Sequence, residues 1–308
     1  MPADKHELIR PTAVSLSARS RGRRTLSEDV TLLELLNATT GYFEKYGVSK
    51  PRLNAELIIA EVLGLKRLDI YLQFDRPITD AERERLRPLV RRRAQKEPLQ
   101  HVMGWTEFFG LRLQCDKRAL VPRPETERLV EEALALCPSE TGTLLDIGTG
   151  TGAVVLAFLS RRPGWGAVAT DISPDALELA RANAAALGIS DRVQFENTDI
   201  WPQQAERHFD LLLSNPPYIA EGLLPSMSPE VQADPRAALD GGLDGLDVIR
   251  RIIKDAPERL APGAPILMEI GDDQGPAVKD LLAGSGFKDI AILPDLNGRD
   301  RVAVARNP

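Results

Sequence analysis

The stretch "TLLDIGTGTGAVVLAF", residues 143–158, decides the fold of this chain of 308 residues. An apolar, strand-like segment leads into a glycine-rich turn, and an apolar, helix-like segment follows the turn. Glycine lets the backbone turn sharply and approach a ligand closely, because it has no Cβ atom. Such a turn is typical of α/β folds that bind a nucleotide at the edge of the sheet, although a purely structural turn looks similar.

The alternation of strands and helices continues toward the end of the chain. Apolar segments at 167–171, 192–196, 209–214 and 265–270 are predicted to be strands, and helical segments lie among them. Strands that alternate with helices favour a parallel sheet. We therefore expect an α/β fold in which helices cover both faces of a parallel sheet.

The front of the chain has a different pattern. Residues 29–98 repeat apolar side chains at three- and four-residue spacing, which predicts a small helical domain, and Thr79 is expected to cap one helix. Residues 99–118 alternate apolar and polar side chains and predict a hairpin-like connector. Residues 1–28 are polar and basic without periodicity, which predicts a disordered extension.

Composition excludes several classes of protein. The chain is 43% hydrophobic and 27% charged, which is ordinary for a globular protein, and no segment approaches the ~18 apolar residues of a membrane span. Cys115 and Cys137 lack metal or disulfide spacing, so we expect reduced thiols in a cytosolic protein. Three scattered histidines argue against a His-based metal site, and no metal is expected.

Charge is divided unevenly along the chain. Residues 1–118 hold 22 basic and 16 acidic side chains, a net charge of +6, whereas residues 119–308 hold 17 and 29, a net charge of −12. This division suggests two modules. The basic front part is compatible with an acidic partner or RNA, and equally with an ordinary solvated helical surface.

An acidic residue follows each of the next two predicted strands. Asp171 lies about 20 residues beyond the glycine turn, where a carboxylate can accept hydrogen bonds from both ribose hydroxyls of an adenosine. Asp171 can also cap the helix that opens at Ser173, and the two roles are compatible. Asp199 follows the third strand, where an adenine ring would lie. The spacing favours a cofactor that contains adenosine.

The fourth strand ends in Asn215-Pro216-Pro217-Tyr218, at the edge of the sheet where α/β proteins bind ligands. Asparagine offers one acceptor and two donors, and proline keeps its carbonyl but has no N–H. Asn215 Oδ1 and the Pro216 carbonyl would form a rigid pair of acceptors for a planar –NH₂ group, and the Tyr218 ring can flank that plane. The alternative is an ordinary loop in which proline ends a strand. The glycine turn and Asp171 favour the functional interpretation.

These motifs together resemble the class I S-adenosylmethionine-dependent methyltransferases, and "NPPY" resembles the branch that methylates planar amide or amino nitrogens. The chain is similar, from about Val30 to its C-terminus, to the release-factor glutamine methyltransferases (PrmC/HemK family). This similarity rests on the segments "GWTEFFGLRL", "LVPRPETERLV", "LLDIGTGTGAVVLAF", "SNPPYI" and "GLDVIRRIIKDAPERLAPGAPILMEIG". The "PRPETE" segment is specific, because the DNA and rRNA enzymes that share the NPPY-type motif lack it.

The resemblance implies a Rossmann-like, seven-stranded class I methyltransferase domain at 119–308, preceded by a small helical-bundle domain at 29–98. It implies an enzyme, a protein-(glutamine-N5) methyltransferase. This enzyme would use S-adenosyl-L-methionine to methylate the glutamine of the Gly-Gly-Gln motif in peptide chain release factors. Its location would be cytoplasmic, and it would need neither a membrane nor direct nucleic-acid binding. The opposite charges of the two parts suggest that the helical domain docks the protein substrate.

Carried over residue by residue, the resemblance also implies roles for individual side chains. The cofactor would contact the glycine turn and the following strand ends: Gly148, Thr149, Gly150, Thr151, Gly152, Asp171, Asp199, Ile200 and Asn215. Family members often carry an aromatic ring at the position of Ile200, which Trp201 follows here.

The substrate glutamine would be bound by Asn215, Pro216, Pro217 and Tyr218, with Asn215, Pro216 and Tyr218 as the catalytic set. Arg123 and Glu125 of "PRPETE" would shape the mouth of the site.

Two other functions use the same motifs. A nucleic-acid amino-methyltransferase, acting on adenine N6 or guanine N2, needs a basic recognition surface. The net charge of −12 on residues 119–308 argues against this function, although the basic front part keeps it open. An inactive methyltransferase-like binding protein is the third interpretation, and the intact glycine turn and NPPY motif argue against such decay.

Overall fold

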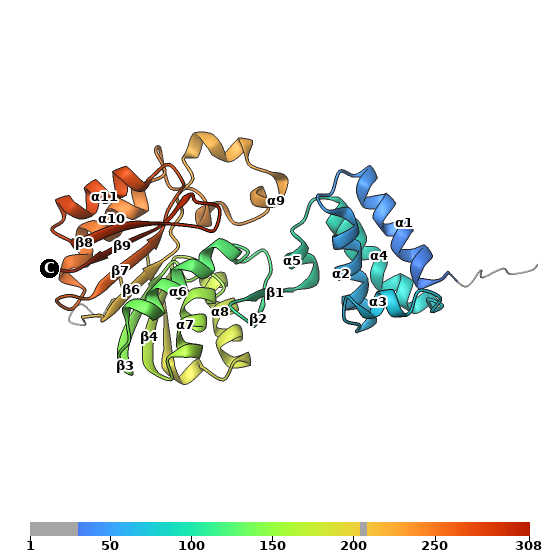
Figure 1. The fold of residues 1–308 in the computed structure, drawn as a ribbon, viewed down its shortest axis with the longest axis horizontal. Helices are drawn as coiled ribbons and strands as arrows, with labels where there is room; N and C mark the ends of the chain where they lie inside the picture. The colour runs from blue at the N-terminus through green and yellow to red at the C-terminus, as the bar shows by residue number, and fades with distance from the viewer. Residues whose placement is uncertain (1–29, 204–207) are drawn as a thin grey trace, which may run out of the picture.

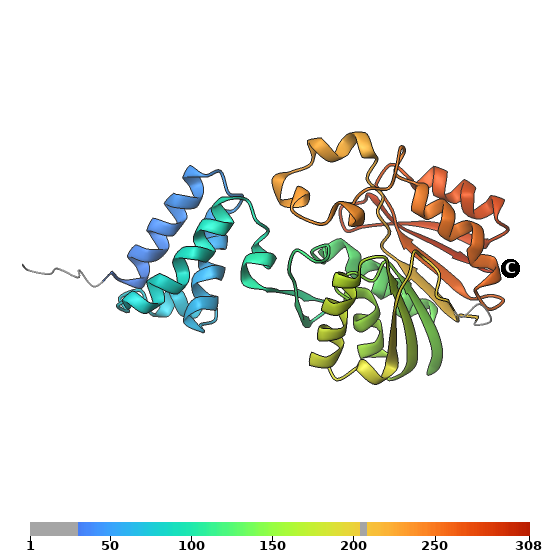
Figure 2. The ribbon, with the colours of Figure 1, turned by 180° about the vertical axis from the view of Figure 1, so that it is seen from behind.

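The computed structural model describes residues 30–203 and 208–308. A helical part and a larger part built on a sheet lie side by side and are joined by a narrow connector (Figures 1 and 2). The extension predicted at 1–28 lies outside the described residues. The boundaries predicted for the domains stay predictions.

The helical part contains α1 (Leu32–Lys45), α2 (Pro51–Leu63), α3 (Asp69–Leu72) and α4 (Asp80–Ala94). Reciprocal capping boxes begin α1 at Thr31 and α4 at Thr79. The cap predicted at Thr79 is therefore confirmed. The helices share an apolar core of their own, separate from the core of the sheet.

The connector consists of α5 (Leu99–Met103) and an antiparallel hairpin of β1 (Trp105–Phe108) and β2 (Leu111–Gln114). Phe109 and Gly110 both have positive φ, 51° and 75°, which is the geometry that tight hairpin turns favour. The backbone N–H of Gln114 donates to Asn183 Oδ1 at 2.7 Å and ties the hairpin to the sheet domain.

The larger part is built on a seven-stranded sheet with the order β5-β4-β3-β6-β7-β9-β8 within the described residues. Its strands are β3 (Thr141–Ile147), β4 (Gly164–Asp171), β5 (Val193–Asn197), β6 (Leu211–Ser214), β7 (Pro265–Glu269), β8 (Lys288–Pro294) and β9 (Asp300–Arg306). This sheet and the helical part confirm the fold class expected from the sequence.

The five strands predicted from the sequence, β3 to β7, pair in parallel as expected. The sheet is extended by β9, which runs antiparallel to both of its neighbours. A tight turn joins β8 to β9, with Asp295 N donating to Arg299 O at 2.8 Å. A turn this short allows only antiparallel pairing, since a parallel pair needs a crossover of a dozen or more residues. The pattern-based assignment did not find β8 and β9.

Helices cover both faces of the sheet. Along β3, Leu144 packs with α6 (Glu127–Leu136) and α7 (Ala153–Arg161), whereas Leu145 packs with α10 (Asp247–Asp255) and α11 (Gly275–Gly284). Neighbouring residues face opposite sides of the sheet because successive side chains of a pleated strand alternate in direction. α8 (Pro174–Ala186) lies on the α7 side. The remaining short helices are η1 (Pro124–Thr126), η2 (Ser190–Arg192), η3 (Glu221–Ser226), α9 (Pro229–Gln232), η4 (Arg236–Ala238) and η5 (Ala256–Glu258).

None of the helices in the described parts of the chain combines the length and the apolar character needed to cross a membrane.

Candidate active site

A cavity of about 300 Å³ opens where β3, β4 and β6 end, at the carboxyl edge of the sheet. It is lined by most of the residues predicted for the site: Gly148, Thr149, Gly150, Thr151, Asp171, Asp199, Ile200, Asn215 and Pro217. Of the residues predicted to contact the cofactor or the glutamine, three are not among its lining: Gly152, Pro216 and Tyr218. Gly152 and Tyr218 pack against the core next to the cavity, and Pro216 is buried between two lining residues, Asn215 and Pro217.

The glycine turn forms one wall of the cavity. Gly148, Gly150 and Gly152 have φ of 72°, 55° and 81°, a conformation that other residues adopt only at a cost. The backbone N–H of Gly148 donates to Thr170 O at 2.9 Å, which fastens the turn to β4. A Cβ atom on Gly152 would lie 3.0 Å from Leu156 Cδ1 and 3.3 Å from the Ala180 side chain. Gly152 is thus required for the packing of α7 against α8, behind the cavity.

Asp171 organises this wall. Its Oδ2 accepts from Gly150 N at 2.8 Å and its Oδ1 accepts from Ser173 N at 2.9 Å, while Ser173 itself caps α8. One carboxylate therefore fixes both the glycine turn and the start of the next helix. Burial raises the pKa of Asp171. Each carboxylate oxygen accepts one of these bonds and retains a second lone pair, and Asp171 lines the cavity.

Asp146 is a lining residue that the sequence reasoning did not select. Its side chain is buried, with 1% of the residue exposed, and its Oδ2 accepts from Thr149 Oγ1 at 2.7 Å. Burial raises the pKa of Asp146 to about 7. The sequence nevertheless marks Asp146 as a candidate, because it is an acidic residue near the end of an apolar strand, just before the glycine turn.

Asp199 and Ile200 form the far rim of the cavity. Asp199 Oδ2 lies 2.7 Å from a guanidinium nitrogen of Arg251. Ile200 has φ of 77°, which is strained for a β-branched residue, and its carbonyl accepts from Thr170 Oγ1 at 2.8 Å. Trp201 packs against the core on the α10 side and is not among the lining residues.

The NPPY segment forms a second wall, next to the glycine turn, because β6 pairs with β3. Asn215 lines the cavity, and its Nδ2 donates to Thr126 Oγ1 at 3.2 Å. Pro216 is buried and Pro217 lines the cavity. The Tyr218 ring packs against the apolar core, and its hydroxyl donates to Glu269 Oε1 at 3.0 Å. The phenol was expected to act through its ring alone, whereas its hydroxyl has a defined partner.

Thr126 and Glu269 complete this wall, and the sequence reasoning missed both. Thr126 Oγ1 donates to Glu269 Oε2 at 2.6 Å, and both side chains are buried. Burial raises the pKa of Glu269. Thr126 belongs to the quoted "PRPETE" region and Glu269 ends a predicted strand, yet 143 positions separate them. Only the fold brings them together.

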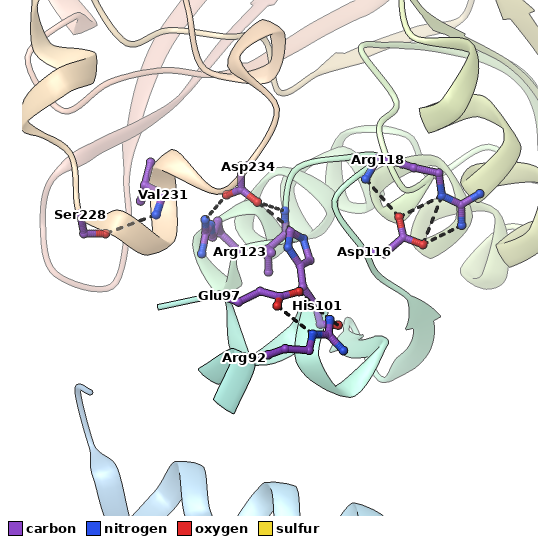
Figure 3. A network of polar contacts seen from close by, with 10 residues as sticks. Arg92, Glu97, His101, Asp116, Arg118, Arg123, Ser228, Val231 and Asp234 are labelled. Atoms are coloured by element: carbon purple, nitrogen blue, oxygen red, sulfur yellow. Dashed lines mark hydrogen bonds and ion pairs between the residues drawn. The ribbon is translucent and has the colours of Figure 1, made fainter. Parts of the chain in front are cut away.

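Arg123 and Glu125 do not line the cavity. Arg123 pairs with the buried carboxylate of Asp234 at 2.6 Å (Figure 3). Asp234 also accepts from Val121 N at 3.2 Å. Burial raises the pKa of Asp234. Glu125 is exposed.

The segment that carries Asp234 also contacts the helical part of the chain. Arg93 of α4 is buried and reaches Glu230 of α9 at 3.1 Å. Pro235, Ala237 and Ala238, which follow directly, line the cavity. Arg123 and Arg93 thus hold the segment that closes one side of the site.

The two walls offer different chemistry. Backbone N–H groups and carboxylates on one side suit a cofactor with ribose hydroxyls and positive charge. From the NPPY wall, Asn215 presents a neutral amide to the same space. Among the described residues that line the cavity there is no histidine, cysteine or lysine.

Comparisons with known proteins agree with this geometry. Residues 34–104 match the PrmC N-terminal domain model, and residues 126–227 match the methyltransferase small domain model. The release factor glutamine methyltransferase of Geobacter sulfurreducens is 40% identical over 277 residues, covering 90% of this chain and 96% of that protein. Its counterpart in Neisseria gonorrhoeae is 40% identical over 266 residues, covering 85% of this chain and 96% of that protein.

Among solved structures, the hMettl16 catalytic domain in complex with a MAT2A 3′UTR hairpin shares the fold, with a TM-score of 0.54 and 19% identity. The match covers 74% of this chain and 81% of that one. The sequence identity of 40% to each of the two relatives, over nearly the full length of both, decides the family. The chain belongs to the release factor glutamine methyltransferases.

Proposed function

We propose that this protein transfers a methyl group from S-adenosyl-L-methionine to the side-chain amide nitrogen, N5, of the glutamine in the Gly-Gly-Gln motif of peptide chain release factors. The observation that carries the proposal is the Asn215 amide. It lines the cavity beside the glycine turn, with its Nδ2 held by Thr126. A neutral acceptor in this place suits a neutral –NH₂ substrate.

The residues present fit S-adenosyl-L-methionine. Asp171 would accept from the ribose hydroxyls, Asp199 and Ile200 would border the adenine, and the buried acid Asp146 would favour a ligand with net positive charge. The glycine turn would let the methionine part approach the backbone without interference from a Cβ atom. The cofactor supplies an electrophilic methyl group on a positive sulfonium.

The protein's own task is to make a poor nucleophile reactive. An amide nitrogen is weakly nucleophilic because its lone pair is delocalised into the carbonyl. Asn215 Oδ1 and the Pro216 carbonyl would accept its two N–H groups, return electron density to nitrogen and hold it in line with the methyl group. Such positioning is worth up to ~7–11 kcal/mol. The proton would leave with or after methyl transfer, through these acceptors to water.

The test is a methyl-transfer assay with labelled cofactor. Purified full-length protein is offered a release factor, total RNA or total DNA, and mass spectrometry locates the methyl group. We expect the label on N5 of the Gly-Gly-Gln glutamine. The matched control is a release factor in which that glutamine is replaced by glutamate. Label on nucleic acid, or equal label on the control factor, would refute the proposal.

We further propose that the helical domain docks the release factor and that the enzyme acts in the cytoplasm, where its substrate is used. The domain has its own core and exposes apolar side chains at Leu68 and Leu72. Replacing both by aspartate should raise the KM for a whole release factor while leaving the KM for a short Gly-Gly-Gln peptide unchanged. Equal KM values for the whole factor in the variant and the native protein would contradict docking through this surface.

A further inference from the structure

We infer that Glu269 is a positioning residue that acts through Thr126 to hold the Asn215 amide with Oδ1 toward the cavity. The inference rests on the proposed function, because it assigns the orientation that amide-nitrogen transfer requires. It concerns a contact that no sequence motif contains, since the three residues come from η1, the end of β6 and the end of β7.

The hydrogen atoms of this network can be counted. Tyr218 and Thr126 each place a hydroxyl on a different oxygen of Glu269, at 3.0 Å and 2.6 Å. In its ionised form, which the charge of Arg301 and the two hydroxyl donors favour, the Glu269 carboxylate only accepts, so the single hydrogen of Thr126 is committed to it. The Thr126 oxygen is then left as an acceptor. The group of Asn215 that lies 3.2 Å from it must be the –NH₂ group.

This assignment fixes the other end of the amide. With Nδ2 held by Thr126, the oxygen Oδ1 remains for the cavity that Asn215 lines. The reversed amide would present two donors to the two donors of a glutamine –NH₂ group, and no hydrogen bond would form between them. The direction of one hydroxyl hydrogen thus decides whether the site accepts its substrate.

Burial gives the network its rigidity. Glu269 is 2% exposed and Thr126 is 3% exposed, so solvent does not compete for either group. A buried carboxylate is costly unless hydrogen bonds or opposite charge offset its desolvation. Two hydroxyl donors contact Glu269, and the positive charge of Arg301 on β9 acts on it. A purely apolar wall would have been simpler to fold, and it would not have oriented Asn215.

Two substitutions act on the network in different ways. Thr126→Val removes the acceptor and keeps the shape. Glu269→Gln places an –NH₂ group where it can donate to the Thr126 oxygen. The Thr126 hydrogen can then turn to Asn215 Oδ1 and reverse the amide. Thr126→Ser retains the hydroxyl and should rescue activity.

The experiment measures two quantities in the full-length protein. The first is kcat on a release factor together with the dissociation constant for S-adenosyl-L-methionine. We expect Thr126→Val and Glu269→Gln to lower kcat by ~10- to 100-fold, since the lost contact serves the transition state, while cofactor affinity changes less than ~2-fold. Thr126→Ser should stay within ~5-fold of the native kcat. Thr39→Val, a buried substitution in α1, is the control for a general loss of packing.

The second quantity is the side-chain amide resonance of Asn215 in the free protein, assigned by its loss in Asn215→Ala. We expect this resonance to move in Thr126→Val and in Glu269→Gln but not in Thr39→Val. This readout needs no substrate, so it decides the orientation even if the native protein fails to methylate a release factor. An unmoved resonance in both variants, or a kcat within twofold of native, would overturn the inference.

Discussion

The two walls of the cavity are built on different principles. The cofactor wall consists of backbone: a glycine turn with positive φ, fastened to β4 and held by the single carboxylate of Asp171. The transfer wall consists of side chains: Asn215, Thr126 and Glu269, which come from three distant segments. Apart from Asp171, we expect the first wall to tolerate changes in side chains that do not alter the path of the chain. We expect the second wall to depend on the identity of each of its three members.

The difference between the walls predicts whether a substitution changes cofactor affinity or turnover. Backbone N–H groups and carboxylates are proposed to contact the cofactor in the ground state and the transition state alike, so their loss should weaken binding. Asn215 is proposed to strengthen its contacts as the amide nitrogen reacts, so its loss should lower turnover. Substitutions on the two walls should therefore separate cofactor affinity from kcat.

Asn215→Ala gives the largest expected effect. It removes the acceptor on the transfer wall, and we expect kcat on a release factor to fall by ~100-fold or more, comparable to the loss of one transition-state hydrogen bond. Cofactor affinity measured by calorimetry should hardly change. Asn297→Ala, in an exposed loop outside the cavity lining, serves as the control. Near-native turnover on a Gly-Gly-Gln substrate would refute both the mechanism and the glutamine assignment.

Asp171→Ala tests the cofactor wall. It removes a charged acceptor and releases the N–H groups of Gly150 and Ser173. We expect S-adenosyl-L-methionine binding to weaken by ~1–3 kcal/mol. Calorimetry measures the change, and Asp191→Ala on the exposed η2 provides the matched control. Unchanged affinity would show that the carboxylate does not contact the cofactor, and the contrast between the walls would fail.

How well the sequence predicted each wall follows from the same contrast. Glycine residues and an acid at strand ends leave a local signature, so Gly148, Gly150 and Asp171 were selected and the structure brings them to one cavity. Thr126 and Glu269 leave no such signature, because a buried threonine and a buried strand glutamate acquire meaning only through their neighbours. The strands β8 and β9 were missed for a related reason. A tight turn, without a helix, joins β8 to β9. The assignment relied on the alternation of strands with helices, so it did not recognise this pair.

Asp146 adds a dependence on pH to the cofactor wall. Burial raises its pKa to about 7, so the carboxyl is largely neutral below that pH and ionised above it. An ionised Asp146 favours a positively charged cofactor. We expect the affinity for S-adenosyl-L-methionine to rise by up to ~10-fold between pH 6 and pH 8, the limit for one titrating group near pKa 7. Asp146→Asn should abolish this rise.

The free protein should respond to pH in the opposite sense. Because the folded pKa of Asp146 is raised above 3.8, the folded state binds the proton more tightly than the unfolded state. The stabilisation that the proton on Asp146 adds to the free energy of unfolding is complete below about pH 4. This stabilisation is lost as the pH rises through about 7. The difference in melting temperature between the native protein and Asp146→Asn should follow this trend. A difference that is flat between pH 4 and pH 8 would contradict the assignment.

Tyr218→Phe should give the smallest effect on activity, and it tests which hydroxyl on the transfer wall positions Asn215. The substitution removes the hydroxyl donor to Glu269 Oε1 but keeps the ring against the core. Thr126 still donates to Glu269, so the hydrogen count that orients Asn215 is unchanged. We expect kcat to fall only ~3-fold, although the free energy of unfolding should drop by ~1–3 kcal/mol because a buried carboxylate oxygen loses its partner.

Tyr218→Ala also removes the ring, leaves a void beside Asn215, and should cost both stability and turnover. Steady-state kinetics and thermal melts on the two variants separate these effects. If Phe lowers kcat as much as Ala does, the hydroxyl itself positions Asn215, and Glu269 acts through Tyr218 instead of Thr126.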